Sequence, residues 1–153
     1  MVTTVTCRGA SGEMVLWNVS AEVGRGKTNR ADDVELARLG YFYANRNPAP
    51  SRHPAFRTAL AAVKPTGGFA DDLDACIRAH EAARGGPQDG YISVMKHASG
   101  QFQKFTFDHK HQWIVVHLNA ELINHTKVFP RIDLIPECGL SLKATVAKIC
   151  TFF

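Results

Sequence analysis

Proline and glycine interrupt the chain at three places, and these breaks limit the length of its first helices. They are "NRNPAP" at 45–50, "PTGG" at 65–68 and "GG" at 85–86. Proline lacks a backbone N–H and clashes with the preceding turn, and glycine favours helix ends, so helices stop at such breaks. We therefore expect three short helices in succession between about residues 30 and 84.

The segment 30–45 carries apolar residues on most of its faces, which predicts a largely buried helix. Asn29 is expected to cap its N-terminus, because Asp32 follows three residues later as the acidic member of a capping box. The glycines at 24 and 26 would let the backbone turn sharply before this cap. The spacing of "GRGKTN" does not match a nucleotide-binding loop.

The second and third segments each show a single apolar stripe. Ser51 is expected to cap the second helix, which Pro65 ends, and the third runs over 71–84 with acidic residues in its first turn. Gly85 and Gly86 stop it. The stripes are Phe56, Ala59, Leu60 and Val63 in the second helix, and Leu73, Cys76, Ile77 and His80 in the third.

The rest of the chain is more irregular. Asp89 and Gly90 predict a tight turn, followed by an extended segment at 91–94. The segment 113–123 fits a helix or a strand, and we favour the helix. A last short helix is expected around Leu142, Val146 and Ile149. Trp113, Leu118, Val146 and Ile149 are expected to pack this C-terminal part against the first three helices.

Charge and composition favour a globular protein with a weak preference for anionic partners. The chain has 18 Lys and Arg against 14 Asp and Glu, a net charge of +4, and 45% of its 153 residues are hydrophobic. The basic residues are scattered, so we expect no nucleic-acid partner. No apolar run reaches the ~18 to 20 residues of a membrane span, and the start lacks a signal peptide. We expect no membrane span, and either a cytoplasmic protein or export to the periplasm by a signal-independent route.

The cysteines and histidines offer alternatives for chemistry. The four cysteines contain no C-x-x-C pair, although a Cys138–Cys150 disulfide is conceivable. Cys76 is expected to be a buried hydrophobe, whereas Cys138 precedes a helix start that would lower its thiol pKa. On a strand, His109, His111 and His117 would share a face and could bind zinc. On a helix they diverge, and His117, Glu121 and His125 align instead. We expect no metal, cofactor or catalytic set.

Two stretches, "VGRGKTNRADDVELARL" and "PTGGFADDLDACIRAHEAARGGPQDGYISV", resemble the peptidoglycan-binding-like domain of bacterial cell-wall enzymes, over about residues 20–95. Ala37 or Arg38 stands where the family has a glutamine, and His80-Glu81 replaces its aromatic-Gln pair. The residues that match the family's pattern are Gly24, Gly26, Asn29, Asp33, Val34, Gly68, Phe69, Ala75, Ile77, Asp89, Gly90 and Ile92.

The resemblance implies a mainly α fold: a three-helix module over 1–96 with its N-terminal lead-in, a short extended segment, and a C-terminal helical extension over 97–153. It implies a non-catalytic bacterial module that binds peptidoglycan or another cell-wall polymer. We expect the ligand to contact polar side chains that flank the groove between the helices. These are Arg25, Asn29, Arg30, Asp71, Gln88 and Asp89.

Two other functions stay open. The first is a protein-interaction or delivery component of a bacterial secretion or contractile toxin apparatus, in which the module holds a protein partner. The second is a small metal-dependent hydrolase that uses the histidines of the second half.

Overall fold

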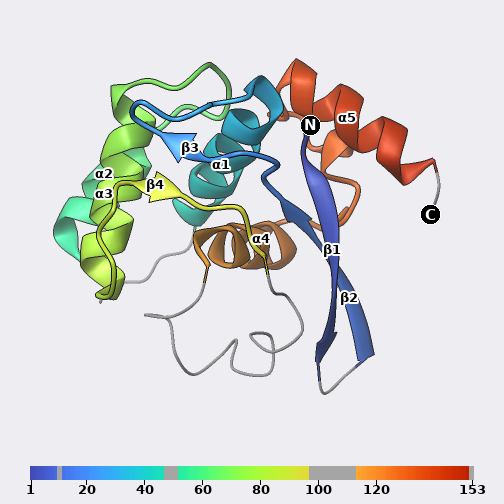
Figure 1. Ribbon diagram of the computed structural model, residues 1–153, viewed down its shortest axis with the longest axis horizontal. Coiled ribbons are helices and arrows are strands. Elements are labelled where there is room, and N and C mark those ends of the chain that lie inside the picture. Colours follow the sequence, from blue (N-terminus) through green and yellow to red (C-terminus); the bar gives the residue numbers. More distant parts are fainter. Residues whose placement is uncertain (10–11, 47–51, 97–112, 152–153) are drawn as a thin grey trace.

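The computed structural model describes residues 1–9, 12–46, 52–96 and 113–151, and these form a mainly helical protein with two small antiparallel sheets (Figure 1). The elements are, in chain order, β1 (Thr3–Gly9), β2 (Gly12–Asn18), β3 (Val23–Gly24), α1 (Ala31–Ala44), α2 (Pro54–Ala62), α3 (Asp71–Arg84), β4 (Tyr91–Ile92), α4 (Ile114–His125), a 3-10 turn η2 (Ile132–Leu134) and α5 (Leu140–Cys150).

Helix α1 is the centre of the protein. It contacts α2, α3, α4 and α5, and only Ala31, Glu35 and Phe42 among its residues are not buried. A helix that is covered on nearly every side needs apolar residues all round, as the sequence predicted. Figure 1 shows α2 and α3 on one side of α1 and α5 on the other.

Gly40 lets α1 and α4 approach closely. A Cβ atom at residue 40 would lie 2.7 Å from Cβ of Leu118, which is itself buried in α4. Only a glycine fits this crossing without movement of one helix. The hydrophobic cluster around it includes residues on both sides of the boundary that we predicted at 96/97, among them Ile77 and Val146.

The first two strands form a hairpin that the sequence analysis missed. β1 pairs with β2 from Thr3 opposite Asn18 to Gly9 opposite Gly12. The amide of Asn119 in α4 then holds the backbone of Trp17: the Trp17 N–H donates to Oδ1 at 2.8 Å, and Nδ2 donates to the Trp17 carbonyl at 2.7 Å. One buried side chain thus does for β2 what a neighbouring strand would do.

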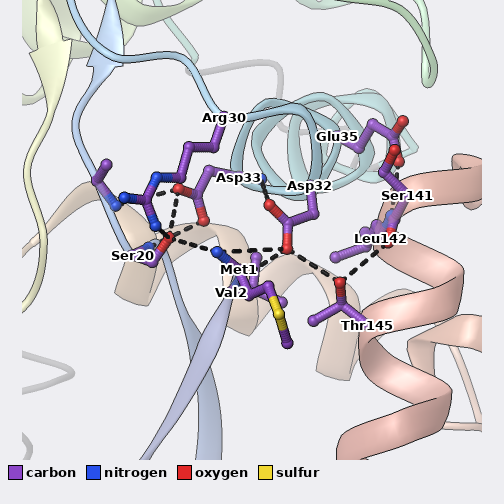
Figure 2. A network of polar contacts seen from close by, with 11 residues as sticks. Met1, Val2, Ser20, Arg30, Asp32, Asp33, Glu35, Ser141, Leu142 and Thr145 are labelled. Atoms are coloured by element: carbon purple, nitrogen blue, oxygen red, sulfur yellow. Dashed lines mark hydrogen bonds and ion pairs between the residues drawn. The ribbon is translucent and has the colours of Figure 1, made fainter.

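Acidic residues at the start of α1 connect it to both ends of the described chain (Figure 2). Asp32 accepts hydrogen bonds from the Val2 N–H at 2.8 Å and the Thr145 hydroxyl at 3.0 Å. Asp33 accepts from the Ser20 N–H at 2.9 Å. Glu35 accepts from the Leu142 N–H at 2.8 Å and so caps α5 from another helix.

Two predicted helix starts differ from the structure in their caps. Asn29 does not cap α1: its cap is Arg30, whose side chain makes no capping hydrogen bond. Asn29 has a φ of 51°, and its Oδ1 accepts from the Gly24 N–H at 2.9 Å, closing the preceding loop. Short polar side chains often bond to nearby backbone in this way. Ser51 lies outside the described residues, and α2 is capped by His53.

The other predicted elements agree with the structure. α3 begins at Asp71 and ends at Arg84, and Gly85 and Gly86 follow with positive φ angles of 68° and 102°. α4 is helical, as we favoured, and α5 covers the predicted last helix. The extended segment at 91–94 contains β4, which pairs with β3. None of the helices in the described ranges combines the length and the apolar character that crossing a bilayer requires.

Candidate functional site

A cleft of about 460 Å³ lies where α1, α2, α3 and α4 meet. Helices α1, α3 and α4 each supply at least one polar side chain to it, and Arg52 and His53 come from the segment just before α2. Cationic, imidazole and aromatic groups dominate its surface. The lining residues are Tyr41, Ala44, Arg52, His53, Phe56, His80, Ala83, Arg84, His117, Leu118 and Glu121.

Aromatic rings form the inner part of the cleft. The His80 imidazole is parallel to the Phe56 ring, with 4.8 Å between centroids, and His117 meets it edge-on at 5.2 Å. The Tyr41 hydroxyl lies 2.9 Å from Nδ1 of His80. Burial raises the pKa of Tyr41 well above its ordinary value, so the phenol keeps its proton and donates it when Nδ1 carries none.

Charged residues also line the cleft. Nη1 of Arg52 donates to the Ala44 carbonyl at 2.9 Å, and its Nη2 lies 3.5 Å from Oε1 of Glu121. Oε2 of Glu121 lies 3.2 Å from Nε2 of His125. Burial raises the pKa of Glu121, against the opposing effect of Arg52 and His125. Arg84 adds a second cation from the last turn of α3.

This arrangement is suited to binding an anionic group. Among the described lining residues, two arginines and one glutamate give a net charge of +1 when the three histidines are neutral. The buried Phe56 ring stacks on His80, and the Arg52 guanidinium lies over the Phe56 ring at 5.3 Å from its centroid. Among the described lining residues there is no thiol or aliphatic hydroxyl to act as a nucleophile.

The six ligand-binding residues predicted from sequence lie outside this cleft, and the structure joins only two of them. Nη2 of Arg25 lies 2.8 Å from Oδ1 of Asp71 and 3.3 Å from Asp74, on the exposed start of α3. Arg30 and Gln88 are exposed on other parts of the surface, and Asn29 closes the loop before α1.

The sixth, Asp89, belongs to a turn held by Glu81. The buried Glu81 carboxylate accepts hydrogen bonds from the N–H groups of Asp89 at 3.1 Å and Gly90 at 2.8 Å. Burial and a side-chain hydrogen bond with Asp89 raise the pKa of Glu81 to about 7. The Asp89 carboxylate itself accepts from the Tyr91 N–H at 3.2 Å. Glu81 therefore fixes the turn that leads into β4.

A second cleft, of about 550 Å³, surrounds the turn at 65–68 and includes Asp71. Its charged groups balance, with Arg38 and Lys64 against Asp71 and Asp72. Arg38 is buried and binds Asp72 through two hydrogen bonds of 2.7 and 2.8 Å, and it also donates to the Gly68 carbonyl. This pair connects α1 to α3. The Arg38 and Asp72 side chains are therefore engaged in contacts that hold the fold together.

The structure describes the side chains of three of the four cysteines, and all three are buried. Cys76, Cys138 and Cys150 are free, so the Cys138–Cys150 disulfide is not formed among the described residues. Cys76 is buried, as expected. Burial raises the pKa of Cys138 to about 12, which overturns our expectation that the start of α5 would lower it. A thiol shielded from water is poorly ionised even near a helix N-terminus.

The predicted histidine sites are only partly described. His109 and His111 lie outside the described residues, and His117 lies in α4, so the strand alternative is wrong over 114–125. Within the described ranges, no three His, Cys, Asp or Glu side chains are close enough together to hold a metal ion. The alignment of His117, Glu121 and His125 along a helix is confirmed in part by the Glu121–His125 contact.

Sequence analysis identified some of the cleft residues without assembling them. His80 was assigned to the stripe of α3, and His117 and Glu121 to one face of α4. It missed Arg52, His53 and Arg84, which gave no local signal because each lies at a helix end where charged residues are common. These residues come together only through the packing of four helices. The spacing of residues along the chain does not predict that packing.

No family model matches the chain. Comparison with curated proteins finds no match. Comparison with solved structures finds none either.

Proposed function

We propose that the protein is a non-catalytic binding module that recognises an anionic polymer of the bacterial cell wall, with peptidoglycan as the first candidate. The observation that carries this proposal is the cationic, aromatic cleft between α1, α2, α3 and α4. A groove between helices accepts a chain of peptide or glycan, and the surplus positive charge attracts acidic groups on it. The ligand comes from the resemblance over residues 20–95, and the order of α1, α2, α3 and the turn at 89–90 is compatible with such a module.

Retention on purified sacculi tests the proposal. We expect the protein to sediment with sacculi at low salt and to be released as salt rises, because exposed charges are screened. Arg84→Ala should reduce retention, since Arg84 lines the cleft. Arg25→Ala is the matched control, because Arg25 is an exposed arginine outside it.

Each other result has a definite meaning. Loss of retention in Arg25→Ala alone would indicate that the ligand binds near Arg25 and Asp71, two of the six residues predicted from the sequence. If the wild-type protein does not sediment with sacculi at any salt concentration, the proposal of a cell-wall ligand is wrong. That result would favour a role in binding a protein partner.

A further inference from the structure

The ion pair between Arg52 and Glu121 differs from the structural pair between Arg38 and Asp72. Arg38 binds Asp72 through two hydrogen bonds of 2.7 and 2.8 Å. Arg52 approaches Glu121 only to 3.5 Å, beyond the ~2.7 to 2.9 Å of a charge-assisted hydrogen bond. A guanidinium has five N–H donors, and this contact leaves Arg52 weakly bound to its carboxylate.

Glu121 also has a second neighbour besides Arg52. Its other oxygen, Oε2, lies 3.2 Å from Nε2 of His125, one turn further along α4. Arg52 is held independently by the Ala44 carbonyl and lies over the Phe56 ring, 5.3 Å from its centroid. The guanidinium therefore stays in position whether or not Glu121 contacts it.

We propose that Arg52 is the oxyanion subsite of the cleft and that Glu121 is its resident placeholder, which an incoming carboxylate or phosphate group replaces. The exchange moves no proton and breaks no covalent bond. Arg52 gives up its contact with Glu121 for a contact with the ligand's oxyanion, and Glu121 stays beside His125. This inference rests on the proposed function, because it names the chemical group by which the ligand is recognised. Burial raises the pKa of Glu121, which is consistent with a carboxylate held where its charge is poorly stabilised.

If Glu121 competes with the ligand for Arg52, removal of the Glu121 charge should tighten anion binding at Arg52. The experiment is an NMR titration of the full chain with sodium acetate and, separately, with inorganic phosphate, at constant ionic strength. We expect Glu121→Gln to lower the dissociation constant of at least one anion by roughly tenfold. Arg52→Ala should abolish saturable binding. Arg52→Lys, which keeps the charge without the planar fork, should bind more weakly than wild type.

A matched control separates the subsite from net charge. Glu22→Gln also adds one positive charge, but Glu22 lies outside the cleft and contacts Lys27 at 3.8 Å. It should leave both dissociation constants unchanged. Preference for acetate would indicate a ligand carboxylate, and preference for phosphate a phosphate-bearing polymer. Melting temperatures of all variants verify that each is folded.

The proposal is overturned if Glu121→Gln binds both anions no more tightly than wild type, or if Glu22→Gln tightens them equally. It is also overturned if Arg52→Lys, when folded, binds as wild type does. The sacculus assay distinguishes the two proposals. If the protein is retained on sacculi but Glu121→Gln leaves the anion dissociation constants unchanged, only the role of Glu121 is wrong. If Glu121→Gln tightens anion binding but the protein is not retained on sacculi, only the cell-wall ligand is wrong.

Discussion

At the scale of the single residue, Asp72 shows how one carboxylate is used to fix a turn. It accepts two hydrogen bonds from the buried Arg38 and one from the Lys64 N–H at 3.2 Å. The side-chain hydrogen bonds from Arg38 hold the pKa of Asp72 at about 2, below its ordinary 3.8. The ionised form is therefore favoured in the folded state.

Because its pKa is lowered on folding, Asp72 stabilises the protein fully above pH ~4, and this stabilisation is lost as the pH falls towards ~2. The shift corresponds to roughly 2 kcal/mol. We expect Asp72→Asn to lower the free energy of unfolding by at least this amount at pH 7, and the difference from wild type to shrink towards pH 2. Urea denaturation across this pH range measures it.

The neighbouring Asp71 supplies the control. Its side chain is exposed and pairs with the exposed Arg25, where solvent screens the charges. Asp71→Asn should leave the unfolding midpoint unchanged at every pH. If Asp71→Asn and Asp72→Asn reduced the stability equally, the hydrogen bonds from the buried Arg38 to Asp72 would not be the source of the stabilisation.

At the scale of the element, the crossing of α1 and α4 depends on Gly40. Alanine is favoured over glycine by about 1 kcal/mol inside a helix, so propensity alone would make Gly40→Ala stabilising. The new Cβ would, however, meet Leu118 at 2.7 Å. We expect a net destabilisation of about 1 to 3 kcal/mol, measured by urea denaturation.

A double-mutant cycle tests the cause. Leu118→Ala alone should cost about 2 to 5 kcal/mol, because Leu118 is buried. If the clash is the reason, the double variant Gly40→Ala, Leu118→Ala should be less destabilised than the sum of the two single variants. A Gly40→Ala protein more stable than wild type would show that the helices can separate without cost.

Elements with strong local signals were predictable, and those that depend on distant residues were not. α3 was correct at both ends because acidic residues and two glycines mark them. The hairpin was not predicted, although "TTVT" is rich in strand-forming residues, because a strand is defined by the partner it pairs with, here residues 12–18. The prediction that Asn29 caps α1 was wrong because its Oδ1 accepts a hydrogen bond from the Gly24 N–H and not from an N–H of the helix.

At the scale of the whole molecule, a single buried cluster predicts a single unfolding transition. The cluster includes Trp17 from the hairpin, Ile77 from α3 and Val146 from α5. Near-ultraviolet circular dichroism, which reports the tryptophan environment, and far-ultraviolet circular dichroism, which reports helix, should therefore give the same midpoint. Ile77→Ala should shift both together, with a loss of about 2 to 5 kcal/mol.

Midpoints that separate, or an Ile77→Ala variant that shifts only the far-ultraviolet signal, would instead divide the protein into independently unfolding parts. The predicted boundary at 96/97 would then be the first place to look for them.

The position of α1 in the chain also has a consequence for synthesis on the ribosome. α1 is made well before α5: Leu142, which donates to Glu35 of α1, and Thr145, which donates to Asp32 of α1, follow these residues by 107 and 113 positions. Until α5 emerges, the most buried of the described helices has one side uncovered, and its acidic residues Asp32 and Glu35 lack these partners. Contacts so distant in sequence form slowly, so the nascent chain passes through a long interval in which α1 is open to aggregation or to a chaperone.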